Sequence, residues 1–243
     1  MKLHLLGVNG PFPESNGATS GYLLQADSAL IQLDMGSGVL ARLTALTAPE
    51  SIDALFLSHW HFDHAADLPV LMYRLQAMGF GEGGPQLAVY APVDESSALR
   101  KIVASVPCFR LTDIAPGDTV TVGSCEIRVG EARHPVPAVS FRIEESGKAF
   151  GYTGDTNTLP SLAGFFRNVD LLLADGLFPA ADWAEGKPHL SAELAASLAA
   201  EAEAGALVIT HLNPVYPPEI LLREARQKYP RVLLASAGQV LPV

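Results

Sequence analysis

Ser58-His59-Trp60-His61-Phe62-Asp63-His64 is the stretch that decides how this chain is organised. Three imidazoles and one carboxylate, all side chains that bind metal ions, fall within its last six residues. The apolar run at residues 54–57 precedes it and predicts a buried strand. The residues after it predict an amphipathic helix whose buried face carries Leu68, Leu71, Leu75 and Met78. We therefore expect the metal-competent residues on a loop between a strand and a helix.

The spacing inside this stretch indicates more than one metal ion. His59 and His61 are two residues apart near a strand end, so their side chains point to the same side. Four ligands packed this closely can hardly serve one small ion together, and two ions completed by distant residues are the more natural geometry. The plain alternative is an exposed polar loop whose histidines have no role.

The pattern His-x-His-x-Asp-His resembles the signature of the metallo-β-lactamase fold hydrolases at every position. This resemblance implies an α/β fold, the four-layer αββα sandwich. The order of predicted elements agrees with it, because strands recur with hairpins in each half and helices are interspersed between them. That order predicts two packed β-sheets flanked by helices. Residues 1–243 are expected to form a single hydrolase domain of this kind.

Three more metal-competent residues each follow an apolar strand, namely His134, Asp155 and His211. Taken singly, each is more simply explained as a structural residue at a strand end. Taken together, they follow the superfamily's order of cluster, His, Asp and His without a gap. We therefore expect them to converge with the cluster where the two sheets meet.

The resemblance then implies a set of ligands for two divalent metal ions. The first ion would be held by His59, His61 and His134, the second by Asp63, His64 and His211, and Asp155 would bridge both together with a water or hydroxide. Zn²⁺ is the expected metal, with Mn²⁺ as the alternative. The iron-containing branch of the superfamily usually has Glu where this chain has His61, which favours hydrolysis over redox chemistry.

Catalytic and supporting roles come from the same resemblance. His189 lies before a helix that Ser191 is expected to cap. It resembles the extra histidine of the ribonuclease Z-like branch, a proton donor or oxyanion stabiliser; its alternative is a loop histidine with no role. Asp63 is expected to act in catalysis as well as in metal binding. Asp34 would support the metal loop from behind the ligands or cap the helix that follows, and Asp175 is interpreted as a cap or support residue, not a ligand.

Charge and composition narrow the substrate. The formal net charge is −10 and Lys and Arg form no cluster, so a long nucleic acid is an unfavourable partner. Only 21 residues lead from His134 to Asp155, and they predict a plain hairpin where bacterial ribonuclease Z enzymes carry a long arm that grips transfer RNA. No apolar run reaches the roughly 18 residues of a membrane helix, and no signal peptide is evident. A cytoplasmic protein, a small anionic substrate, no membrane partner and, by analogy with relatives, a homodimer are expected.

These observations predict a dinuclear metal-dependent hydrolase. The favoured activity is that of a phosphodiesterase on small or cyclic phosphodiesters, with a metal-bridging hydroxide as nucleophile. A ribonuclease Z-like endoribonuclease for transfer RNA 3′ ends and a hydrolase of lactones or thioesters remain as alternatives. A non-enzymatic binding module is the least favoured function. Such a module would be expected to lack some of the metal ligands, whereas the ligand set of this chain is complete.

Overall fold

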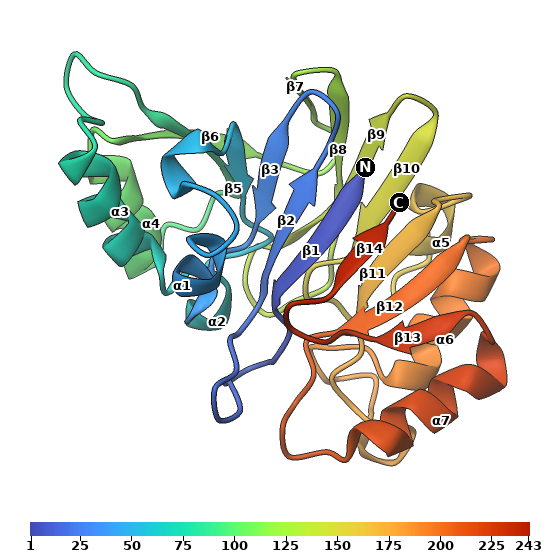
Figure 1. The fold of residues 1–243 in the computed structure, drawn as a ribbon. Helices are drawn as coiled ribbons and strands as arrows, with labels where there is room; N and C mark the ends of the chain where they lie inside the picture. The colour runs from blue at the N-terminus through green and yellow to red at the C-terminus, as the bar shows by residue number, and fades with distance from the viewer.

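Apolar residues at every second position give the strands of this protein one apolar face each. Leu3 and Leu5, for example, face the same buried side of their strand, as Phe141 and Ile143 do in another. In the computed structural model, which describes residues 1–243, such faces pack two seven-stranded β-sheets against each other, with helices on the outer faces (Figure 1). The predicted αββα sandwich is therefore confirmed.

The first sheet contains the N-terminal half of the chain. Its strands are, in spatial order, β14 (Val240–Pro242), β1 (Lys2–Gly7), β2 (Gly21–Gln25), β3 (Leu30–Leu33), β4 (Ala54–Phe56), β5 (Leu87–Pro92) and β6 (Phe109–Ile114). Strands β14 to β3 pair antiparallel, whereas β3 to β6 pair parallel. The C-terminal strand β14 thus joins the N-terminal strand, and the two chain ends lie side by side (Figure 1).

The second sheet contains most of the C-terminal half. Its strands are, in spatial order, β13 (Val232–Leu234), β12 (Ala206–Thr210), β11 (Leu171–Asp175), β10 (Lys148–Tyr152), β9 (Val139–Glu145), β8 (Cys125–Glu131) and β7 (Thr119–Val122). Strands β10 to β13 are parallel, and β7 to β10 are antiparallel. The β9–β10 turn is only Ser146-Gly147, both at positive φ, so this segment is the plain hairpin that was predicted.

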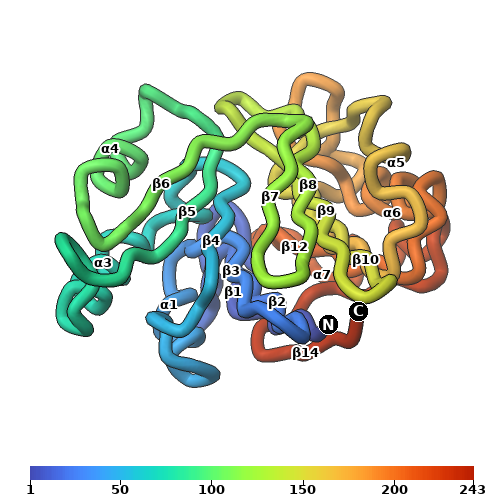
Figure 2. The backbone as a smooth tube through the Cα atoms, turned by 90° about the horizontal axis from the view of Figure 1, so that it is seen from above, coloured from blue at the N-terminus to red at the C-terminus, as the bar shows by residue number.

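The helices fall into two groups that cover opposite outer faces. The first sheet is covered by α1 (Val39–Leu43), α2 (Phe62–Ala65), α3 (Leu68–Ala77) and α4 (Ala98–Ser105), and the second by α5 (Ser161–Phe165), α6 (Ala192–Glu201) and α7 (Pro218–Lys228). Figure 2 shows α3 and α4 at one end of the molecule and α5 and α6 at the other, with the strands between them. None of these helices combines the length and the apolar composition that a membrane crossing demands.

Two local predictions need correction. Met78 follows the last residue of α3 and is 55% exposed, so the buried face of that helix ends at Leu75. The sequence also predicts a helix over about residues 94–105, but α4 begins only at Ala98, because the Asp94 carboxylate accepts hydrogen bonds from Ser96 and holds a turn. Ser97 then caps the helix by accepting a hydrogen bond from the Arg100 N–H.

One buried carboxylate ties the two sheets together. Glu145, the last residue of β9, accepts hydrogen bonds from the N–H groups of Asp27 and Ser28, between β2 and β3, at 2.8 and 3.2 Å. It also accepts hydrogen bonds from the hydroxyl groups of Ser28 and Ser124, each at 2.7 Å. Burial alone would raise the pKa of Glu145, but these donors lower it from 4.5 to about 2.

Glu145→Gln is therefore expected to destabilise the fold in a pH-dependent way. A carboxyl whose pKa is lowered by folding stabilises the folded state above its ordinary pKa of 4.5, and the gain is lost as the pH falls toward 2. We expect the free energy of unfolding in urea to fall by about 2 kcal/mol at pH 7, and the difference to shrink at pH 3. Glu144→Gln, at a one-third exposed neighbour, should cost less than about 1 kcal/mol. Equal losses for the two variants would contradict the assigned role.

Candidate metal centre

Parallel strands bring the metal-competent residues to one edge of the sandwich. The loop after β4 carries the His-x-His-x-Asp-His stretch in the first sheet. In the second sheet, Asp155 follows β10, Asp175 ends β11 and His211 directly follows β12. Carboxyl ends of parallel strands share an edge, so these side chains meet although they lie far apart in sequence. His134 joins them from the loop between β8 and β9.

The first group consists of three imidazoles. The Nδ1 atom of His61 lies 3.0 Å from Nε2 of His59 and 3.1 Å from Nε2 of His134. His59 is fully buried and the other two are partly buried. Burial lowers the pKa of all three, so they are neutral at pH 7, which is the form that binds a metal ion.

The second group joins carboxylates to imidazoles. Nε2 of His211 lies 3.1 Å from Oδ2 of Asp63 and 3.4 Å from Oδ2 of Asp155. Nε2 of His64 lies 3.2 Å from Oδ1 of Asp155. Asp155 also reaches the first group, since its Oδ2 is 3.7 Å from Nε2 of His59. The structure thus brings all seven predicted ligand residues together, with Asp155 between the two groups.

The spacing of these atoms fits divalent cations. Two ligand atoms that are each 2.0–2.1 Å from a tetrahedral ion lie about 3.3 Å apart. The separations between the atom pairs described above run from 3.0 to 3.7 Å. Nε2 of His64 is buried and has no hydrogen-bond partner, although it faces two carboxylates. A cation would satisfy this atom and explain why so many acceptor atoms crowd together.

The charge of the centre also calls for a cation. Asp34, Asp63 and Asp155 lie within it, and no Lys or Arg forms an ion pair with any of them. Burial opposes protonation of His64, but the carboxylates of Asp155, Asp34 and Asp63 raise its pKa well above the ordinary value. Buried negative charge of this kind is costly unless positive charge compensates it. The site therefore favours a positive charge beside Nε2 of His64.

Asp34 lies behind the metal loop. Its Oδ2 lies 2.8 Å from Nδ1 of His64 and accepts a hydrogen bond from the hydroxyl of Tyr152 at 2.6 Å. Its Oδ1 accepts the N–H of Ser58 at 2.7 Å. The alternative role as a helix cap is wrong, because α1 has Gly38 at its cap position and no side-chain cap. By accepting Nδ1–H of His64, Asp34 leaves Nε2 of that ring free to face the centre.

His189 is paired with Asp175 beside the second group. Its Nδ1 lies 2.8 Å from Oδ2 of Asp175, and its ring stacks on that of His211 at 4.9 Å. Burial opposes the charged form, but the charge and the hydrogen bond of Asp175 raise the pKa of His189 to about 9. Asp175 also accepts the N–H groups of Thr156 and Leu177, so its carboxylate is occupied within the protein. Ser191 caps α6 behind His189, as predicted.

Residues 183–188 lie next to this histidine and are held in part by Asn157, a residue that the sequence did not single out. The buried amide of Asn157 donates to the carbonyls of Glu185 and Lys187. Trp183 donates its indole N–H to the carbonyl of His189. Nδ1 of His134 lies 3.2 Å from the carbonyl of Pro188, so the first group is tied to this segment as well. The only sequence signal for Asn157 was its place two residues after Asp155.

The backbone conformation of His211 and its contact with Gly10 both determine where its imidazole lies. His211 has a φ of 58°, a left-handed conformation that is rare for such a residue and is found where the surroundings impose it. Gly10 lies directly against its ring, since a Cβ there would be 2.1 Å from Nε2 of His211. Any other residue at position 10 would displace the imidazole, so the loop before β2 helps to place it.

Known proteins resemble the chain over its full length. The family model described as "Beta-lactamase superfamily domain" matches residues 31–212. The probable metallo-hydrolase YhfI of Bacillus subtilis is 31% identical, with 99% of each chain covered. The ribonuclease Z of Methanosarcina acetivorans is 23% identical, with 97% of this chain and 96% of that protein covered.

Solved structures show the same architecture. The crystal structure of YhfI matches with a TM-score of 0.91 at 30% identity and covers 99% of this chain and 98% of that one. A diphosphatase from the PhnP family matches at 0.77 and 17% identity, covering 100% and 97%. Zinc-bound PqqB from Methylobacterium extorquens matches at 0.79 and 18% identity, covering the whole of both chains.

Proposed function

The chain belongs to the beta-lactamase superfamily and is a metal-dependent hydrolase, and from that premise we propose that it hydrolyses small or cyclic phosphodiesters with two divalent metal ions. The observation that carries the proposal is the meeting of two ligand groups at Asp155 with His189 alongside. A phosphodiester hydrolase needs charge compensation at the phosphate and a proton for the departing oxygen. The two parts of this centre supply those two needs.

The residues divide naturally between two ions. His59, His61 and His134 would hold one, Asp63, His64 and His211 the other, and Asp155 would contribute to both. Divalent cations held there would acidify a bound water and offset the negative charge of a phosphate. We propose Zn²⁺, because imidazole and carboxylate ligands suit it and PqqB, which shares the fold, was crystallised with zinc.

His189 is the proposed proton donor for the leaving group. Its pKa of about 9 keeps it protonated at pH 7. Asp175 engages Nδ1, so Nε2 is the atom left to give a proton to an alkoxide as the phosphorus–oxygen bond breaks. Asp175 is thus a positioning residue that also stabilises the charged ring. Its two backbone donors fix the carboxylate, and the carboxylate in turn fixes the ring.

Two features favour a small phosphodiester over other substrates. Relatives of this fold include proteins named ribonuclease Z and diphosphatase, and both names imply bonds to phosphorus. The hairpin after His134 has no extension that could grip a long RNA, and the net charge of −10 would repel one.

The proposal predicts turnover of bis(p-nitrophenyl) phosphate by zinc- or manganese-loaded protein. We expect kcat/KM for this diester to exceed that for p-nitrophenyl butyrate and for simple lactones by at least roughly tenfold, since the centre would stabilise phosphate charge most strongly. Precursor transfer RNA serves as the third substrate. Faster turnover of the carboxylic esters, or specific cleavage of the RNA at nanomolar enzyme, would replace the proposed substrate class.

A further inference from the structure

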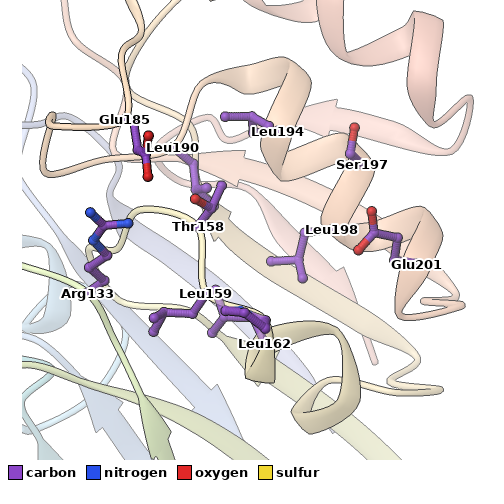
Figure 3. A pocket seen from close by; sticks show the side chains of 11 residues that line it. Arg133, Thr158, Leu159, Leu162, Glu185, Leu190, Leu194, Ser197, Leu198 and Glu201 are labelled. Carbon is purple, nitrogen blue, oxygen red and sulfur yellow. The ribbon is translucent and has the colours of Figure 1, made fainter.

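Two cavities border the loops that carry the metal centre. The first, of about 440 Å³, lies beside α5 and α6, with Arg133, Glu185 and Glu201 around a floor of leucines (Figure 3). No residue of the metal centre lines it, so a molecule bound there would not contact the proposed metal ligands directly. The second, of about 520 Å³, is lined by His134 itself and therefore adjoins the metal centre. Its volume is that of a small-molecule site.

The side chains that line the second cavity are apolar except for that of His134, and backbone groups supply the rest of its polar surface. Pro92 and Val93 form one wall, Ile114 and the residues after it a second, and Pro135 to Val139 a third. No Lys, Arg, Asp or Glu side chain lines it. Four of its lining residues are prolines, which have no N–H to offer a polar ligand. An anionic group would therefore find no charged side chain in the lining to replace its water.

Hydrogen bonds to the metal loop fix the position of two walls. The indole N–H of Trp60, which lies between two predicted ligands, donates to the carbonyl of Pro92 at 2.8 Å. On another side, the N–H of Val139 donates to the carbonyl of Ser58 at 2.9 Å. The cavity thus holds a constant place relative to His59 and His61. A substrate whose phosphate lies at the metal centre would direct one of its ester groups into it.

We propose that this cavity binds an uncharged apolar ester group, so that the preferred substrate is a phosphodiester with one alkyl or aryl arm. The inference rests on the proposed phosphodiesterase activity and adds its specificity. The carboxylate of Asp94, the residue after Val93, does not line the cavity, and it accepts hydrogen bonds from the N–H and hydroxyl of Ser96 instead. Val93 is 43% exposed at the rim, where an apolar ligand would cover it.

The test uses p-nitrophenyl phosphodiesters that share one leaving group and differ in the other arm. Metal-loaded protein should show kcat/KM rising from the methyl to the butyl and phenyl esters, by roughly threefold to fourfold for each added methylene. Val93→Asp should lower kcat/KM for the butyl and phenyl esters more than for the methyl ester, and so remove most of the butyl and phenyl advantage. Val70→Asp is the matched control: it adds the same charge at another exposed valine, at the start of α3, and should leave the series unchanged. Val93→Phe, which narrows the cavity without adding charge, should lower turnover of the phenyl ester selectively.

The outcomes separate this inference from the proposed function. Turnover of the diesters with equal kcat/KM across the series would overturn the apolar subsite and leave the phosphodiesterase in place. A preference for the p-nitrophenyl ester of thymidine 5′-phosphate over the phenyl ester would show that a nucleoside occupies the cavity, and would also overturn it. If no diester turns over, the proposed function fails. Calorimetry with phenylphosphonate and methylphosphonate then tests the apolar subsite without turnover. We expect phenylphosphonate to bind more tightly, and equal affinities for the two would contradict the subsite.

Discussion

Asp155→Ala is expected to remove both bound metal and catalysis. The carboxylate is buried between the two ligand groups, 3.2 Å from Nε2 of His64 and 3.4 Å from Nε2 of His211. Burial alone would raise the pKa of Asp155, but these imidazoles hold it well below the ordinary range of a carboxyl. It is therefore an anion whose Oδ1 faces His64 and whose Oδ2 faces both His211 and His59, the latter in the first group at 3.7 Å. In the proposed two-ion centre its loss would take one ligand from each ion at once, and we expect turnover to fall by at least about 10³-fold.

Metal content and thermal unfolding give readouts that do not depend on activity. Wild-type protein should bind close to two equivalents of Zn²⁺, and its Tm should rise when the metal is added, because a ligand that binds only the folded state stabilises it. Asp155→Ala should bind less metal and show a much smaller rise. Asp170→Ala, which removes an exposed carboxylate paired with Lys148, is the control and should behave as wild type in both. Two tightly held equivalents in Asp155→Ala, with activity within tenfold, would contradict the bridging role.

His189→Ala has the second largest expected effect, and its size should depend on the leaving group. A poor leaving group such as an alkoxide needs a proton, so turnover of alkyl diesters should fall roughly 10²–10⁴-fold. p-Nitrophenolate leaves without a proton, so turnover of its esters should fall far less. An equal loss for both kinds of ester would indicate that His189 binds substrate or supports the fold and does not donate a proton.

The pH profile tests the same histidine through its partner. A donor must be protonated, so kcat for an alkyl diester should decline as the pH rises through the His189 pKa of about 9. Asp175→Asn removes the anion that raises this pKa, and the decline should therefore move to lower pH by about one unit or more. His189→Ala should abolish this limb of the profile. If the decline at high pH stays at the same pH in Asp175→Asn, the group that titrates is not the His189 that Asp175 holds.

The sequence alone determined the sandwich and the set of metal-competent residues. The cluster after β4 could be recognised because its residues are neighbours in sequence and because apolar runs mark the strand before it. His134, Asp155 and His211 could be added because each follows an apolar strand, and parallel strands place their carboxyl ends at one edge. Even so, only the tertiary structure shows that these seven side chains come within ligand distance of one another. Periodicity is a local property, so it specifies strands and their ends well and the ends of helices such as α4 less well.

The tertiary structure alone decided which side chains support the centre. Tyr152 and Asp34 are 118 positions apart, and Asp175 is 14 from His189, yet each pair is hydrogen bonded. Asn157 holds the segment next to His189 from a position that no pattern marks. The apolar cavity at His134 likewise arises where loops from both sheets meet. Such contacts depend on how the two sheets pack, and packing is set by the burial of the whole core, which no short stretch of sequence specifies.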